Sequence, residues 1–204
     1  CLDHRVHHLH VDKVDDPYNI NSGFWYAHIG WICKDGNPKD FSDLGRDLAA
    51  NKLIQWQHRN YFLLGVLSGM VLPTLIGWAF GSALGGFAFG SLLRITVVHH
   101  ATFFVYSLAH YWGKQNFTYC NTAKKNFVLY FFTYGEGYHN FHHLFANDYR
   151  NGIRWFDFDP TKWTIKGLEI CGFASKLKIT PQIQILRAKL EMKKKRLEAT
   201  CPTD

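Results

Sequence analysis

A long apolar region fills the middle of the chain and is its strongest structural signal. Between residues 60 and 113 the only Lys, Arg, Asp or Glu is Arg94. One membrane-spanning helix takes about 20 apolar residues, so this region is long enough for two. We place the spans near residues 61–81 and 87–109, joined by the short uncharged turn GSALGG. The alternative is a buried helical hairpin of a soluble protein, which would rarely need so long an uncharged run.

The apolar region also carries signs of close helix packing and of orientation. Glycines four residues apart, such as Gly65 and Gly69, let helices approach closely. Pro73 is expected to kink the first span, and Arg94 is expected to extend its guanidinium toward the membrane surface. Basic residues flank both outer ends, which the positive-inside rule places in the cytoplasm. They are Arg46, Lys52 and Arg59 before the region, and Lys114, Lys124 and Lys125 after it.

One histidine pattern, His-x-x-His-His, occurs on both sides of the apolar region. Its members are His4, His7 and His8 in the first copy, and His139, His142 and His143 in the second. Residues at i, i+3 and i+4 share one face of a helix, so each copy presents three imidazoles together. Two such helices facing each other can hold two ions, and imidazole suits iron, copper, nickel and zinc. Ordinary surface or core histidines are the alternative, which the repeated triplet disfavours.

A seventh histidine extends this predicted metal site. His110 lies at the expected cytoplasmic mouth of the second span, where a further ligand would be useful. The five cysteines are scattered and form no C-x-x-C pair, so neither a disulfide framework nor a cysteine metal site is expected. The cysteine pattern is typical of a reducing compartment.

Length and charge narrow the classes of protein. The 204 residues suffice for one domain, and the formal net charge is +7. Beside so long an apolar region, that charge indicates anionic lipid headgroups or an anionic substrate rather than nucleic acid. The chain starts at Cys1, with a metal motif from residue 4. Because functional sites rarely lie so close to a true terminus, we interpret the chain as lacking an amino-terminal part.

The carboxyl-terminal stretch PQIQILRAKLEMKKKRLE predicts a helix that starts after Pro181. Its larger apolar residues are expected near one face: Ile183, Leu186, Leu190 and Leu197. A basic run covers residues 193–196, namely Lys193, Lys194, Lys195 and Arg196. A solvated helix near the bilayer is one interpretation, and a docking element for an acidic electron carrier is the other.

Several motifs together resemble a known family. They are DHRVHH, DPYN, GFWYAHIGW, SLAHYWG, NTAKKN and YGEGYHNFHHLFANDYRNGIRW, within residues 1–165. In this order they are similar to the membrane fatty acyl desaturases of the Δ9, stearoyl-CoA desaturase type, with a bacterial character. The resemblance implies a mainly α-helical integral membrane protein with four spans, of which two are present here. It also implies a cytoplasmic, histidine-rich helical cap that holds two iron ions (Fe²⁺).

The resemblance assigns roles to individual residues. The implied iron ligands are His4, His7, His8, His110, His139, His142 and His143, with two more from an upstream box that this chain lacks. By the same resemblance, Tyr106 stands where the family has an Asn that supports a metal-bound water. Helix spacing, rather than the resemblance, makes Glu136 and Asn140 candidates to support a ligand imidazole, since Glu136 lies three residues before His139. Helix or turn roles are open for Glu136 and Asn140. Substrate contacts are implied for Asp3, Lys34 and Phe103, although Asp35 and Gly36 stand where basic residues are expected.

The implied reaction is O₂-dependent insertion of a cis double bond into a saturated acyl chain, carried by CoA or by a lipid. Side-chain acid–base chemistry does not reach unactivated C–H bonds, so a redox metal is required. The sequence shows no haem, flavin or iron–sulfur motif, so electrons are expected from ferredoxin or cytochrome b5. A multi-pass protein in membrane lipid is expected, with its active site on the cytoplasmic side. As one incomplete desaturase domain, the chain divides into cytoplasmic 1–60, hairpin 61–109 and cytoplasmic 110–204.

Two other functions share some of these features. A membrane di-iron hydroxylase of fatty acids or alkanes uses similar histidine chemistry but would yield an alcohol. A metal-handling membrane protein would bind ions without consuming O₂. It would be expected to carry acidic or histidine residues along both spans, and residues 61–81 contain neither.

Overall fold

The computed structural model describes residues 2–34 and 45–200, and their regular structure is helical. Within those residues the only pairing of extended backbone is an isolated antiparallel bridge between Lys114 and Lys125. The mainly α-helical expectation is therefore confirmed for this part of the chain. The chain divides into two compact units, the first made of Cys1–Val6 and Asp35–His100, the second of His7–Lys34 and Ala101–Asp204.

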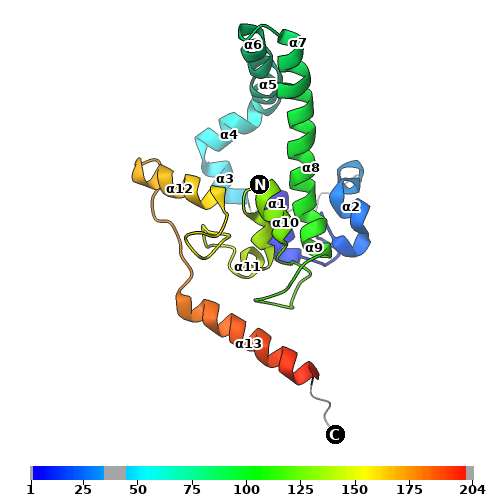
Figure 1. The fold of residues 1–204 in the computed structure, drawn as a ribbon, viewed down its shortest axis with the longest axis vertical. Coiled ribbons are helices and arrows are strands. Elements are labelled where there is room, and N and C mark those ends of the chain that lie inside the picture. The colour runs from blue at the N-terminus through cyan, green and yellow to red at the C-terminus, as the bar shows by residue number, and fades with distance from the viewer. Residues whose placement is uncertain (1, 35–44, 201–204) are drawn as a thin grey trace. The chain divides into compact units, whose positions relative to one another are not determined.

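The first unit is dominated by an apolar helical hairpin (Figure 1). One arm consists of α5 (Tyr61–Val66), the π-helical segment η4 (Leu67–Val71) and α6 (Leu72–Ala79). The returning arm begins with α7 (Ala83–Gly85), the π-helical η5 (Gly86–Leu93) and α8 (Arg94–Tyr106). Before the hairpin lie α3 (Arg46–Ala50) and α4 (Lys52–Arg59), and the unit also holds the first residues of α1 (Leu2–His10).

Both arms are long and apolar enough to cross a membrane. They run over Tyr61–Ala79 and Ala83–Tyr111. In the most apolar part of each arm, none of the first and 22% of the second is buried by the rest of the chain. A soluble core helix would hide such a surface, so this exposure favours lipid contact over the soluble hairpin.

The turn between the arms is shorter than the sequence suggests. The second arm starts at Ala83 rather than near residue 87, because the Ser82 side chain accepts a hydrogen bond from the Gly85 amide (3.0 Å) and caps the helix early. Gly77 and Gly86 face each other across the turn. A Cβ added to Gly86 would lie 2.6 Å from the Pro73 carbonyl oxygen. Glycine is therefore what lets the two backbones approach this closely.

Polar side chains join the arms through backbone carbonyls. The Arg94 guanidinium donates to the Gly69 carbonyl on the opposite arm (3.0 Å) and to the Gly90 carbonyl on its own (2.8 Å). The Ser91 hydroxyl donates to the Met70 carbonyl (3.1 Å). The expectation that Arg94 reaches for the membrane surface is therefore wrong. The accepting carbonyls on the opposite arm, those of Gly69 and Met70, lie in η4, where π-helical geometry departs from the usual i→i−4 pairing.

The second unit holds the remaining helices. These are the rest of α1, η1 (Ile20–Ser22), α2 (Phe24–His28), η2 (Gly30–Cys33), the end of α8, α9 (Leu108–Tyr111), α10 (Phe127–Phe132), η6 (Glu136–Tyr138), α11 (His139–Leu144), α12 (Pro160–Ile170) and α13 (Gln182–Thr200). Its core contains Tyr18, Ala109, Leu129 and Phe141, each at most 4% exposed.

Helix α13 begins directly after Pro181, as the sequence predicts, and buries a face that does not carry its larger apolar residues. Ile185, Ala188 and Met192 pack inward, at 0%, 8% and 4% exposure. The larger apolar residues, which the sequence places near one face, are exposed: Ile183, Leu186, Leu190 and Leu197. Basic residues, among them Lys189 and Arg196, flank the inward face on one side.

Candidate metal centre

Three helices of the second unit bring histidines together. Helix α1 supplies His7 and His8, α9 supplies His110, and α11 carries the second triplet. Gly135 sets the start of α11, because its φ of 106° lies in the left-handed region and an added Cβ would lie 2.6 Å from an Asp159 carboxylate oxygen. The chain then turns through η6 directly into His139.

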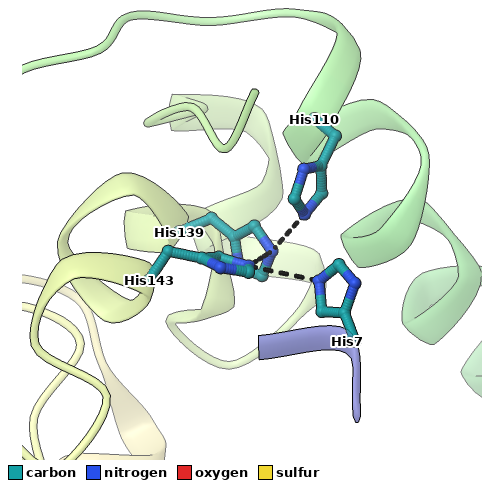
Figure 2. A group of neighbouring side chains, drawn as sticks. All are labelled: His7, His110, His139 and His143. Carbon is teal, nitrogen blue, oxygen red and sulfur yellow. Dashed lines mark hydrogen bonds between the residues drawn. The ribbon is translucent and has the colours of Figure 1, made fainter. Parts of the chain in front are cut away.

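Four of these imidazoles converge on one point, as Figure 2 shows. The Nε2 atom of His143 lies 3.3 Å from that of His7 and 3.0 Å from that of His139, and His139 Nε2 lies 3.0 Å from His110 Nε2. Potential ligand atoms of all four lie within 4.8 Å of one another. His7, His110 and His139 are at most 2% exposed.

A second convergence adjoins the first. The Nε2 atoms of His8 and His142 lie 3.0 Å apart, and the ring of His8 stacks on that of His143 with centroids 4.4 Å apart. Since His4 precedes His8 by one turn of α1, the two share a face of that helix. Histidines of the two triplets thus face each other, as the repeated spacing predicts.

Hydrogen bonds fix the tautomers of two imidazoles. The Nδ1 of His7 donates to the buried Asp16 carboxylate (2.7 Å), which leaves Nε2 as a lone pair. The Thr122 hydroxyl gives its single proton to Asp12 (2.5 Å), so it accepts from the Nδ1 of His110 (2.8 Å). His110 therefore also presents its Nε2 lone pair to the cluster.

Burial favours the neutral form of His139 and His143. Desolvation, followed by the neighbouring imidazoles, holds the pKa of His139 and of His143 well below the usual 6.5. Several neutral Nε2 lone pairs that point at one another cannot all be satisfied by hydrogen bonds. A cation coordinated by them resolves the conflict, and the all-imidazole set fits a transition metal such as iron, zinc, copper or nickel.

Two residues that hold the imidazoles, Asp16 and Thr122, were not predicted from the sequence. Asp16 also accepts from the amides of Tyr18 and Asp12, both at 2.9 Å, so the carboxylate is rigidly placed. Ligating histidines commonly donate their second N–H to such carboxylates or hydroxyls. Asp16 lies in the DPYN motif, soon after the first triplet, and that position was a usable signal. Thr122 lies far from both triplets, and no local pattern marks it.

Asn140 lies between two cluster histidines on α11, but its own contacts are with a loop. Its side-chain oxygen accepts from the amides of Asn116 and Phe117 (2.9 and 2.8 Å), and its nitrogen donates to the Thr118 and Ala123 carbonyls (3.0 and 2.8 Å). Asn140 therefore fixes the loop that carries Thr122.

Tyr106 and Phe103 lie on α8 within an aromatic group. The Tyr106 ring stacks on that of Tyr18 at 4.1 Å, and Tyr18 in turn lies 5.3 Å from the ring of His7. Phe103 is 8% exposed and contacts the ring of His28 at 5.7 Å. The ring of Tyr18 thus lies between Tyr106 and the imidazole of His7 in this chain of contacts.

Glu136 does not contact an imidazole among the described residues. Its carboxylate accepts from the Asn151 side chain (2.9 Å), and the Nδ1 of His139 is buried without a partner. The expected support of a ligand by Glu136 is therefore not what the structure shows. The reason is that Glu136 opens η6 one turn earlier and faces the loop of Asn151.

Two of the three implied substrate residues, Asp3 and Lys34, are exposed, whereas Phe103 is buried. Asp3 is exposed in the first turn of α1, and the ammonium group of Lys34 lies over the Tyr26 ring at 5.3 Å. Asp35 and Gly36 lie outside the described residues.

Comparison with known proteins decides the family. The model of the family described as "Fatty acid desaturase" matches residues 1–171. The chain belongs to the fatty acid desaturase family. The family match covers both histidine triplets and His110, so the cluster coincides with the part of the chain that defines the family.

Individual desaturases agree with this assignment. The chain is 41% identical over 200 residues to acyl-CoA desaturase 1 of Saccharomyces cerevisiae, covering 95% of this chain and 38% of that protein. It is 40% identical over 199 residues to a probable acyl-CoA desaturase of Schizosaccharomyces pombe, covering 96% and 41%. An sn-1 stearoyl-lipid 9-desaturase of Anabaena variabilis is 32% identical over 182 residues, covering 89% and 65%.

The coverage and the identities of these matches each add an observation. The chain spans about two-fifths of the length of the two yeast relatives. The yeast proteins are more similar to it than the Anabaena protein is, so the bacterial character expected from the motifs is not supported by these relatives.

Proposed function

We propose that the full-length protein is an O₂-dependent fatty acyl desaturase that inserts a cis double bond at the Δ9 position of a saturated chain. The observation that carries the proposal is the convergence of imidazoles from α1, α9 and α11 in a chain of the desaturase family. The relatives' names, acyl-CoA and acyl-lipid desaturases, favour an acyl chain on CoA or on a lipid.

The proposed metal ligands form two groups. His7, His110, His139 and His143 would hold one iron ion, and His4, His8 and His142 would hold the other. When bound, the iron pair supplies the O₂ activation that side chains lack. Asp16 and Thr122 keep two of the imidazoles in the ligating tautomer. The buried site limits water around the cluster.

The overall reaction balances with an external donor. One O₂ takes up four electrons, two from the pair of C–H bonds that becomes the double bond and two from the donor. With two further protons, the products are the alkene and two water molecules. A ferredoxin or a cytochrome b5 suits the donor role, because each passes one electron at a time.

Orientation in the membrane follows from the flanking charges. The basic residues before Tyr61 and after Tyr111 favour the cytoplasm for both outer ends of the hairpin. The cluster then lies on the cytoplasmic side, where soluble electron carriers are available. Four spans are proposed for the full-length protein, by family resemblance.

The test is expression of the full-length protein in a host that lacks its own desaturase, followed by gas chromatography of fatty acid methyl esters. Fatty acids with a cis double bond at carbon nine are expected, and a His142→Ala variant should abolish them. A His58→Ala variant is the matched control, because His58 lies on α4, outside both proposed ligand groups. Hydroxylated fatty acids in place of alkenes would show a hydroxylase, and an unchanged profile would refute oxidation of acyl chains.

A further inference from the structure

A basic groove of about 690 Å³ lies in the second unit, between α13 and the loops next to α11. Five of the described residues that line it are basic and one is acidic: Lys125, Arg154, Lys189, Lys193, Arg196 and Asp157. We use the name basic groove for the surface made by these six residues. Its charge is therefore strongly positive.

The floor of the basic groove adjoins the histidine cluster. Tyr138 and Phe141 line it, and both belong to the segment that carries the second triplet. Tyr138 directly precedes His139, and Phe141 directly precedes His142. Helix α11 thus contributes Phe141 to the groove and the second histidine triplet to the cluster.

The positive charge of the groove is only partly compensated. Asp157 pairs with Arg154 at 2.9 Å. The pKa of Lys125 is lowered, first by burial and then, against the pull of Asp157, by the charges of Arg154, Lys189 and Lys114. Lys189 and Lys193 are exposed and make no ion pair among the described residues. An anionic partner would relieve this repulsion.

The groove is also preorganised. The ammonium group of Lys189 lies over the Phe117 ring at 5.5 Å, and that of Lys125 lies 5.5 Å from the Tyr138 ring. The Arg196 side chain donates to the Tyr119 hydroxyl at 2.8 Å. Cations held in place in this way give a surface of fixed charge pattern, which steers a charged partner and fixes its orientation.

We propose that the basic groove is the docking surface for an acidic one-electron carrier protein. This inference rests on the proposed function, which needs two electrons per turnover from outside the chain. The carrier would dock twice per turnover and pass one electron each time across α11 to the metal centre. Because such encounters use small interfaces and charge complementarity, a concave basic surface directly behind the ligand helix suits them.

An anionic bilayer is the competing occupant, and the faces of α13 argue against it. At 100° per residue, Lys189, Lys193 and Arg196 share one face of the helix. The exposed apolar residues Leu186 and Leu190 extend along a neighbouring face. A lipid surface would be met by those side chains, whereas the basic groove is lined by Lys189, Lys193 and Arg196 and by Phe141 of the ligand helix.

The experiment measures carrier binding to the full-length protein in nanodiscs of neutral phosphatidylcholine. The probes are a soluble [2Fe–2S] ferredoxin and the haem domain of cytochrome b5, both acidic, titrated from about 20 to about 200 mM salt to vary charge screening. The test variant is Lys189→Gln with Lys193→Gln. The matched control is Arg187→Gln with Lys194→Gln, which removes the same charge from the same helix at residues that do not line the basic groove.

One probe at least is expected to bind, with a Kd that rises with salt. The test variant should weaken its binding about tenfold at low salt and flatten the salt dependence, whereas the control should stay within about twofold of the parent. Equal weakening in both variants, no weakening in either, or no saturable binding of either carrier would overturn the docking proposal. So would a loss confined to binding of phosphatidylserine vesicles, which would identify a lipid-facing surface instead.

Failure here is separable from failure of the proposed function. If the expressed protein makes double bonds but replacing Lys189 and Lys193 leaves carrier binding unchanged, only the docking surface is refuted. If no double bonds form, the catalytic proposal fails, whatever the binding result.

Discussion

At the scale of single residues, the imidazoles of the cluster depend on neighbours that are not themselves histidines. Asp16 and Thr122 each receive an Nδ1–H, which turns the Nε2 lone pairs of His7 and His110 toward a common point. Asp16 is 4% exposed, and its carboxylate accepts three hydrogen bonds, so it holds the His7 imidazole firmly. Asp16 is a positioning residue in this account.

Replacing Asp16 with Asn tests that role. Loss of the carboxylate removes a charge-assisted acceptor from His7, so iron affinity of the full-length protein should fall about 10- to 100-fold. Competition with a chelator measures the affinity. The Asp15→Asn variant is the control, because its carboxylate lies 4.0 Å from His10, which is outside the cluster. Equal affinity in Asp16→Asn and the parent would remove Asp16 from the account.

The burial of Glu136 predicts that the free energy of unfolding depends on pH. Burial, aided by the nearby Asp159, raises its pKa above 4.5, and the Asn151 hydrogen bond opposes this. The folded protein therefore keeps a proton that the unfolded chain releases, so stability falls as pH rises from about 4.5 through the folded pKa. Glu136→Gln keeps an acceptor for Asn151 without the charge. Its melting temperature should exceed that of the parent at pH 8, with a gap that shrinks toward pH 5. A gap independent of pH would contradict this.

At the scale of elements, the hairpin relies on the approach of Gly77 to Gly86. A Cβ at residue 86 would lie 2.8 Å from the Gly77 Cα and 2.6 Å from a Pro73 oxygen, so the arms would have to separate. We expect Gly86→Ala to cost about 1–3 kcal/mol, the usual range for overpacking. Thermal unfolding in detergent measures this. Gly65→Ala, with nothing within 4 Å of the added Cβ, should be neutral or slightly stabilising. Equal losses in both variants would contradict the close approach.

Elements also show what the sequence can and cannot predict. Apolar run length located both arms, and the i, i+3, i+4 spacing predicted which face of α1 and α11 carries the imidazoles. The start of the second arm was missed by about four residues, because one capping side chain, Ser82, decides it. The buried face of α13 was missed because small Ala188 and flexible Met192 pack inward, while larger residues stay exposed.

Long-range contacts were beyond sequence reasoning. Thr122 reaches His110 only because Asn140 holds the intervening loop, and that loop contact joins segments more than 15 residues apart. The Arg94 contact with Gly69 likewise depends on how η4 departs from α-helical geometry. Local patterns report periodicity and caps, and they do not report which distant backbone group a polar side chain meets.

At the scale of the whole molecule, the chain combines an apolar hairpin with a histidine-rich unit that is proposed to hold iron and to receive electrons at the basic groove. Family membership and the converging imidazoles support each other, since the matched residues 1–171 contain every proposed ligand. The hairpin would keep the acyl chain in lipid, and the basic groove would keep the donor on the aqueous side.

The metal content of the purified full-length protein tests the central claim most directly. Inductively coupled plasma mass spectrometry, with Mössbauer spectroscopy of ⁵⁷Fe-grown protein, should find two iron ions per chain, all lost or halved when His139 or His142 is replaced by Ala. The His58→Ala protein should keep both ions. A protein that holds no iron, or whose iron is indifferent to His139 and His142, would contradict the account.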